Sequence, residues 1–140
     1  KKKKKKKKKK TSRTGIMQIS ILIMSKKTRN RERRKIMRRT EIVDMIRSIL
    51  HKVAPNAQII LYGSEARGEA RPDSDIDLLI LVDEPQLTPE YEQEIIRPLY
   101  ELEVKSGVII SPMIMLRRLW ENRPFQTPFS LNVMNEGIVL

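Results

Sequence analysis

The sequence has no cysteine and a single histidine, His51. The first absence excludes disulfide frameworks, thiolate metal sites and cysteine nucleophiles. The second argues against zinc sites and catalytic triads built on histidine. Aromatic residues make up only 4% of the 140 residues, but apolar residues make up 39%, which is enough for the core of one small domain.

The sequence also lacks an apolar run of membrane-spanning length. Residues 16–24 are mostly apolar, but nine residues fall well short of the roughly 20 that cross a bilayer. A short apolar run after a basic one resembles a signal peptide, yet no small-x-small cleavage site follows it. We therefore expect a cytoplasmic protein with no membrane partner.

Acidic residues are almost absent from the first 35 positions. Residues 1–35 hold 18 of the 29 Lys and Arg residues and a single acid, Glu32, whereas residues 36–140 hold the other 11 and 16 acids. The run of ten lysines predicts a disordered basic extension, either a tail that binds polyanions or an added stretch. The domain expected over residues 36–140 has a net charge of −5, which argues against nucleic acid as the main partner.

Apolar spacing in residues 36–140 predicts helices that alternate with strands. The predicted helices cover about 37–53, 89–105 and 116–121, and the predicted strands cover 58–62, 76–82 and 108–115, before a closing segment over 128–140. Pro98 predicts a kink or a split in the second helix, and Pro112 predicts an edge strand or a bulge. This order predicts an α/β (α+β) fold, with a small mixed β-sheet and flanking helices.

Two aspartates stand at the start of the second predicted strand. Side chains two residues apart in a strand share a face, so Asp75 and Asp77 lie side by side where the chain enters the core. Paired carboxylates in such a place repel each other unless a cation offsets them, and Mg²⁺ favours such oxygen ligands. The alternative is a pair of acids on a solvated strand end.

A glycine and a serine end the first predicted strand. Gly63 lets the backbone turn sharply and approach a ligand closely, and the Ser64 hydroxyl could then hold phosphate oxygens. Arg67 follows one turn later and could reach the same phosphates. A plain turn is the alternative, but the two motifs together predict a phosphate site that faces a metal site.

Residues 61–68 read Leu-Tyr-Gly-Ser-Glu-Ala-Arg-Gly, and residues 74–80 read Ser-Asp-Ile-Asp-Leu-Leu-Ile. This pattern of Gly-Ser, ten residues and Asp-x-Asp resembles the signature of minimal nucleotidyltransferase (MNT) domains, which belong to the DNA polymerase beta nucleotidyltransferase superfamily. The signature covers residues 59–82. The size and element order of about 37–140 also fit that family, while residues 1–35 lie outside it.

The resemblance implies a nucleotidyltransferase that binds an NTP, with ATP as the expected substrate, and two Mg²⁺ ions. Gly63 and Ser64 would bind the triphosphate, and Asp75 and Asp77 would bind the metals and carry catalysis. A nucleoside monophosphate would pass to an acceptor hydroxyl and release pyrophosphate. Some MNT proteins are antitoxins that adenylylate a HEPN-type toxin, so by analogy the expected acceptor is a partner protein of this kind.

One expected group is missing from the pattern. The family commonly adds a third carboxylate on a later strand, but residues 108–115 contain no acid, and Ser111 stands about where it is expected. Glu101 and Glu103 precede that strand, and we expect them on the solvent-exposed face of a helix. The alternative to an active transferase is therefore a nucleotide-binding or interaction module that neutralises a partner by binding it.

Overall fold

The computed structural model describes residues 37–140, so the disordered extension predicted over residues 1–35 lies outside the described residues. In chain order the elements are α2 (Arg39–Val53), β1 (Gln58–Tyr62), α3 (Gly63–Ala66), β2 (Ile76–Val82), α4 (Pro89–Ser106), β3 (Ile110–Leu116), α5 (Arg117–Glu121), α6 (Pro128–Glu136) and β4 (Ile138–Val139). Every predicted helix and strand is present, with ends shifted by one or two residues at most. The Gly-Ser pair opens the single helical turn α3.

The four strands form one mixed sheet in the order β3-β2-β1-β4. β2 runs parallel to β3 and antiparallel to β1, and β4 pairs antiparallel with β1. The small mixed sheet with flanking helices is therefore confirmed. Pro112 lies in β3, at the edge of the sheet, as its missing backbone N–H predicts.

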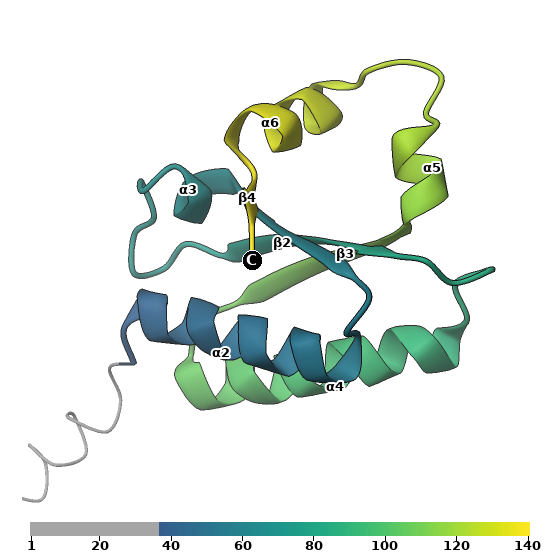
Figure 1. The fold of residues 1–140 in the computed structure, drawn as a ribbon. Helices are drawn as coiled ribbons and strands as arrows, with labels where there is room; N and C mark the ends of the chain where they lie inside the picture. The colour runs from purple at the N-terminus through teal and green to yellow at the C-terminus, as the bar shows by residue number, and fades with distance from the viewer. Residues whose placement is uncertain (1–36) are drawn as a thin grey trace, which may run out of the picture. The chain divides into compact units, whose positions relative to one another are not determined.

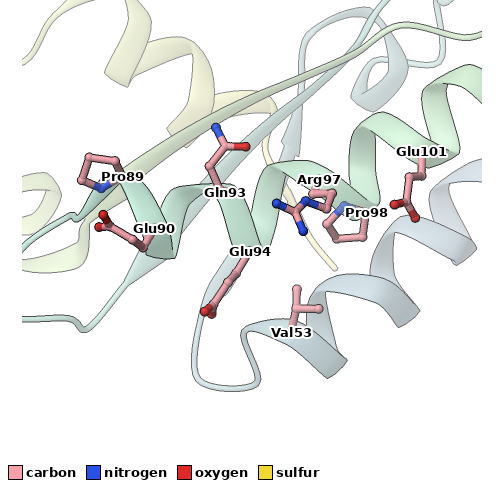
Figure 2. Close-up of a pocket in the computed structure, with 8 residues that line it drawn as sticks. All are labelled: Val53, Pro89, Glu90, Gln93, Glu94, Arg97, Pro98 and Glu101. Carbon is pink, nitrogen blue, oxygen red and sulfur yellow. The ribbon is translucent and has the colours of Figure 1, made fainter.

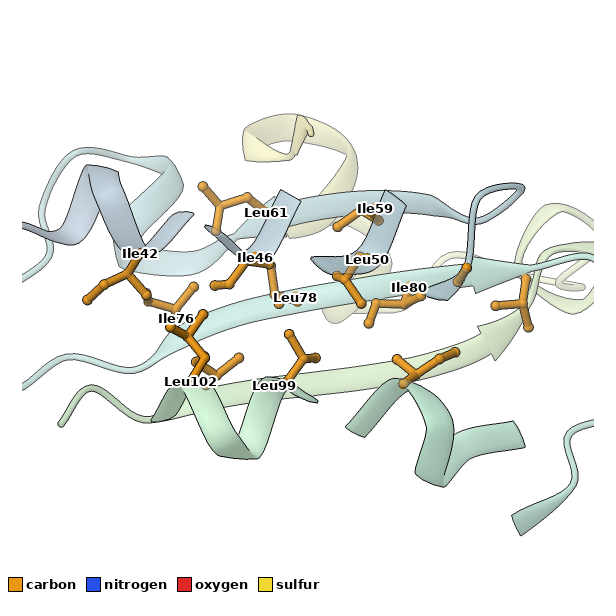
Figure 3. Packing of buried hydrophobic residues seen from close by; sticks show 14 of the residues in the cluster. Ile42, Ile46, Leu50, Ile59, Leu61, Ile76, Leu78, Ile80, Leu99 and Leu102 are labelled. Carbon is orange, nitrogen blue, oxygen red and sulfur yellow. The ribbon is translucent and has the colours of Figure 1, made fainter. Parts of the chain in front are cut away.

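Helices α2 and α4 lie together across one face of the sheet (Figure 1). Their buried residues recur every three or four positions and meet the side chains that alternate toward this face along β1 and β2, as Figure 3 shows. The residues labelled there are Ile42, Ile46, Leu50, Ile59, Leu61, Ile76, Leu78, Ile80, Leu99 and Leu102. Nearly all of them are fully enclosed, so this layer is the main core.

Helices α5 and α6 pack on the opposite face of the sheet, where the buried cluster is smaller. Its buried members are Ile60, Leu79, Leu81 and Val133. Aromatic rings extend this cluster, because Phe129 makes edge-to-face contacts with both Tyr62 and Trp120. This second face is the one that carries the candidate site.

Helix α4 is the longest described helix, with 18 residues. Thr88 caps its start, because the Thr88 hydroxyl accepts a hydrogen bond of 3.2 Å from the backbone N–H of Tyr91, and Gly107 caps its end in a left-handed conformation. The helix continues through Pro98, so the predicted split into two pieces does not occur. Within residues 37–140, no helix combines the length and apolarity needed to span a membrane.

Candidate active site

Three neighbouring strands bring polar side chains into one row near the start of β2. The register places Tyr62 of β1 opposite Asp77, and Asp77 opposite Ser111 of β3. Paired residues share a face, so the three side chains lie on the side of the sheet that carries α5 and α6. Asp75 precedes β2 and accepts a hydrogen bond of 3.3 Å from the Ser111 hydroxyl. The two aspartates and Ser111 therefore form one cluster.

The glycine of the Gly-Ser pair lies against this cluster. Gly63 follows β1 with a φ of +74°, a left-handed conformation that residues with a side chain rarely adopt. A Cβ atom at this position would overlap the carboxylate of Asp77, so the Gly63 backbone and the Asp77 side chain are in close contact. The structure thus brings together the bend predicted for phosphate and the acids predicted for metal.

The carboxylate of Asp77 is in an unfavourable electrostatic environment. Partial burial, and then the negative charge of Asp75, raise the pKa of Asp77 above its ordinary value, and the Glu136 carboxylate acts in the same direction. The guanidinium of Arg67 opposes this rise. The charged form of Asp77 is therefore disfavoured, as expected for a site that a cation completes.

Sequence reasoning missed one carboxylate that reaches this site from the far end of the chain. Glu136, the last residue of α6, accepts a hydrogen bond of 3.1 Å from the backbone N–H of Gly63 and one of 2.8 Å from Arg67. The Arg67 guanidinium lowers the pKa of Glu136, with a smaller contribution from the Gly63 N–H. Arg67 also donates to Glu69 at 2.8 Å.

The next residue explains how α6 delivers Glu136. A Cβ atom at Gly137 would lie 2.7 Å from Ile60 of β1 and would overlap the carbonyl of Val133. Only glycine therefore lets the end of α6 approach the sheet this closely. No local sequence motif marks this contact, because Glu136 and Gly63 are separated by 73 residues.

A second missed residue fixes the loop that leads to the aspartates. Arg39 at the start of α2 donates to Glu65 of α3 at 2.6 Å and to the backbone carbonyl of Ser74 at 2.8 Å. The Arg39 side chain is only 18% exposed. Its guanidinium therefore ties α3 to the residue before Asp75, a role that no motif in the sequence indicated.

The acids that precede β3 do not supply a third carboxylate. The prediction that Glu103 lies on the solvent-exposed face of α4 is wrong. Glu103 is half-buried and accepts a hydrogen bond of 3.0 Å from the backbone N–H of Ile110. Glu101 is exposed, as expected. Among residues 37–140, no three Asp, Glu, His or Cys side chains gather in an arrangement that could hold a metal ion. Ser111 holds the place where the third acid was expected.

A separate hollow of about 860 Å³ lies along α4. Figure 2 shows its lining, which includes Glu90, Glu94 and Arg97 of α4 and Val53 of α2. These helices cover the face of the sheet opposite to Asp77. The hollow is therefore not part of the candidate site.

A family model described as the nucleotidyltransferase domain matches residues 43–128, which is more than half of the chain. That range contains the Gly-Ser bend, both aspartates and Ser111. The chain belongs to the nucleotidyltransferase domain family. This confirms the resemblance drawn from residues 59–82, whereas Glu136 lies outside the matched range.

Two proteins of Methanocaldococcus jannaschii are similar to this nucleotidyltransferase domain. Each is named "putative protein adenylyltransferase". One is 36% identical over 81 residues, which are 58% of this chain and 75% of the relative. The other is 37% identical over 83 residues, which are 59% of this chain and 76% of the relative.

Two solved structures are also similar. One is described as the "structure of putative minimal nucleotidyltransferase", with 27% identity, a TM-score of 0.49 and coverage of 74% of this chain and 97% of that one. The other is described as the "crystal structure of the toxin-antitoxin with AMP-PNP", with 23% identity, a TM-score of 0.46 and coverage of 69% of each chain.

The contact between Gly63 and Asp77 predicts different outcomes for two glycine substitutions. Gly63 and Gly68 both have φ above +70°, but nothing lies within 4 Å of a Cβ at Gly68. Gly68→Ala should therefore lower the free energy of unfolding only by the cost of holding an alanine in the left-handed conformation, about 1–2 kcal/mol. Gly63→Ala adds the overlap with Asp77 and should cost on the order of 1–3 kcal/mol more. Urea unfolding measures both, and equal losses would contradict the contact.

The raised pKa of Asp77 predicts that this residue destabilises the metal-free fold. Because its pKa is higher in the folded than in the unfolded state, the stability of the fold falls as the pH rises from the unfolded-state pKa through the folded-state pKa. In chelator-containing buffer at pH 7, Asp77→Asn should unfold at a higher temperature than the wild type. The difference should shrink as the pH falls below about 4, where an ordinary aspartate also becomes protonated.

The control for this thermal unfolding experiment is Asp73→Asn, which changes an exposed carboxylate in the same loop. It should behave like the wild type at both pH values. Millimolar Mg²⁺ should raise the unfolding temperature of the wild type more than that of Asp77→Asn. A destabilised Asp77→Asn variant at pH 7 would show that the carboxylate is structural.

Proposed function

We propose that this domain transfers AMP from ATP to a hydroxyl group on a partner protein. The observation that carries the proposal is the contact of Gly63 with Asp77, in a cluster that also holds Asp75 and Ser111. Membership of the nucleotidyltransferase family supports the reaction type. The names of the two archaeal relatives support adenylyl transfer and a protein acceptor.

The triphosphate would bind at the bend between β1 and α3. The backbone N–H of Gly63 and the Ser64 hydroxyl are its hydrogen-bond donors, and Arg67 adds a positive charge. Since Gly63 has no side chain, the Asp77 carboxylate can lie directly against the backbone that carries this N–H donor. The contact of Gly63 with Asp77 then sets the phosphates beside the carboxylates.

The donor set at the start of β2 fits Mg²⁺. Asp75 and Asp77 offer two carboxylates, and the disfavoured charge of Asp77 calls for a cation. Mg²⁺ commonly takes one or two carboxylates and completes its shell with water and substrate phosphates. When bound, one or two such ions would neutralise the charge that develops on the phosphates.

In the proposed reaction the acceptor oxygen forms a bond to the α-phosphorus of ATP, and the bond from that phosphorus to the pyrophosphate oxygen breaks. Pyrophosphate leaves with both electrons of the broken bond. Because Asp75 and Asp77 are proposed to hold the metal and Ser111 replaces the expected third acid, the acceptor hydroxyl loses its proton to solvent water. The protein mainly aligns the groups and offsets charge, as phosphoryl chemistry requires.

The proposed acceptor is a HEPN-type toxin, which would make this chain the antitoxin of a toxin–antitoxin pair. The resemblance to MNT domains supports this choice, and the names of the two archaeal relatives support a protein acceptor.

Transfer of label from α-³²P-ATP to a protein in cell extract tests the proposal. With Mg²⁺ present, the wild type should label a partner protein, and Asp77→Asn should reduce labelling by at least about 100-fold, because phosphoryl transfer depends on charge stabilisation. Asp73→Asn is the matched control and should label like the wild type. Equal labelling by Asp77→Asn, or none by the wild type, would contradict the proposal.

The second candidate function is a module that neutralises its partner by binding alone. The observation that favours it is Ser111 beside Asp77, in the place of the expected third acid. Replacement of Asp75 and Asp77 distinguishes the two functions. A binding module protects its partner equally well when Asp75 and Asp77 are replaced, whereas a transferase does not.

Ser111→Asp tests whether the missing carboxylate limits transfer. Ser111 pairs with Asp77 in the register and bonds to Asp75, so an acid there would join the pair and could accept the acceptor proton. Labelling in the assay above should rise by about 100-fold, the lower end of general-base effects. Ser111→Ala is the control and should not increase it. No gain in Ser111→Asp, with its fold intact by circular dichroism, would show that the acid is not limiting.

A further inference from the structure

Two of the three donors proposed for the triphosphate, the Gly63 N–H and Arg67, are already bonded to an anionic group of this chain. One oxygen of the Glu136 carboxylate accepts from the Gly63 N–H at 3.1 Å, and the other accepts from Arg67 at 2.8 Å. The Glu136 side chain is only 18% exposed, so it is held inside the site. A carboxylate presents two oxygens to these donors much as a phosphate group would.

We propose that Glu136 occupies the phosphate subsite as a competitor built into the fold, and that ATP must displace it to bind. This inference rests on the proposed function, because it names the residue that sets nucleotide affinity at that same site. The Gly63 N–H has a single hydrogen, so Glu136 and a phosphate group compete for it, and Glu136 also takes one of the N–H donors of Arg67. The occupied arrangement is therefore a closed form of the site.

The negative charge of Glu136 also opposes the binding of a triphosphate. The negative charge of Glu136 acts on Asp77 with the same sign as that of Asp75, so it adds repulsion where a triphosphate must enter. Arg67 lowers the pKa of Glu136, so at neutral pH Glu136 remains charged. Displacement must then come from a competing anion and its cation rather than from protonation.

The geometry allows Glu136 to leave without dismantling the site. Glu136 is the last residue of α6, so its side chain can turn away while Val133, one turn earlier, stays buried against the sheet. Arg67 keeps its second bond, from Nε to Glu69 at 2.8 Å, which holds the guanidinium near Gly63. Departure of Glu136 therefore frees two donors in place.

Direct binding of pyrophosphate and of ATP, each with Mg²⁺, tests the proposal by isothermal titration calorimetry on the full chain. Glu136→Gln removes the charge but can still accept from the Gly63 N–H, and Glu136→Ala removes both bonds. Affinity for pyrophosphate should increase about 10-fold in Glu136→Gln and more in Glu136→Ala, since each releases a charge-assisted hydrogen bond. Affinity for ATP should increase in the same order.

Two controls isolate the phosphate subsite. Glu94→Gln removes an exposed carboxylate from α4, on the other face of the sheet, and should bind both ligands like the wild type. Adenosine carries no phosphate, so the wild type, Glu136→Gln and Glu136→Ala should bind it with equal affinity. Undetectable binding of adenosine by all three proteins also meets this expectation. Circular dichroism at the titration temperature checks that each variant is folded.

A merely structural role for Glu136 predicts the opposite result. If both Glu136 variants bind pyrophosphate no more tightly than the wild type, or if no variant binds it, the inference is overturned. The labelling assay separates this failure from failure of the proposed function. If the Glu136 variants bind pyrophosphate more tightly but no protein is labelled, the inference stands and the transferase function is rejected. If a protein is labelled but the variants do not bind pyrophosphate more tightly, the transferase function stands and the inference is rejected.

Discussion

The contact between the Gly63 backbone and the Asp77 carboxylate is the constraint on which the rest of the site depends. It requires a residue without a side chain, in a left-handed conformation, at the point where β1 leaves the sheet. It also requires antiparallel pairing of β1 and β2 in one register, since a shift by one residue would turn Asp77 to the other face. The bend and the acid are thus fixed by one contact.

This arrangement concentrates negative charge in a small volume. The charges of Asp75 and Glu136 both act on Asp77, and Arg67 is the cation that acts on both Asp77 and Glu136. The main core, on the other face of the sheet, is fully apolar and supports the fold independently of these charges. The domain can therefore carry an electrostatically unfavourable cluster on the face that holds α5 and α6.

The parts of the site that lie close together in sequence were predictable, and those formed by distant contacts were not. Gly63 follows β1, and Asp75 and Asp77 lie at the start of β2. The apolar runs of these two neighbouring strands are clear in the sequence, and their pairing brings Gly63 and Asp77 together as predicted. Glu136 reaches Gly63 only because α6 docks through Gly137 onto Ile60, and Arg39 reaches Ser74 across 35 residues. Neither contact has a local pattern. Pro98 does not split α4 into two helices, because Ile95 and Leu99 pack in the core on either side of it and hold α4 together.

The short strand β4 gives the end of the chain two simultaneous attachments. Ile138 pairs with Leu61 of β1, and the backbone N–H of Leu140 donates to the carbonyl of Ile59 at 2.9 Å. A single residue, Gly137, separates this sheet edge from Glu136. Peeling of β4 away from β1 would therefore pull directly on that carboxylate. A molecule that bound the exposed side chains of Ile138 and Val139 would therefore also act on the position of Glu136 beside Gly63 and Arg67.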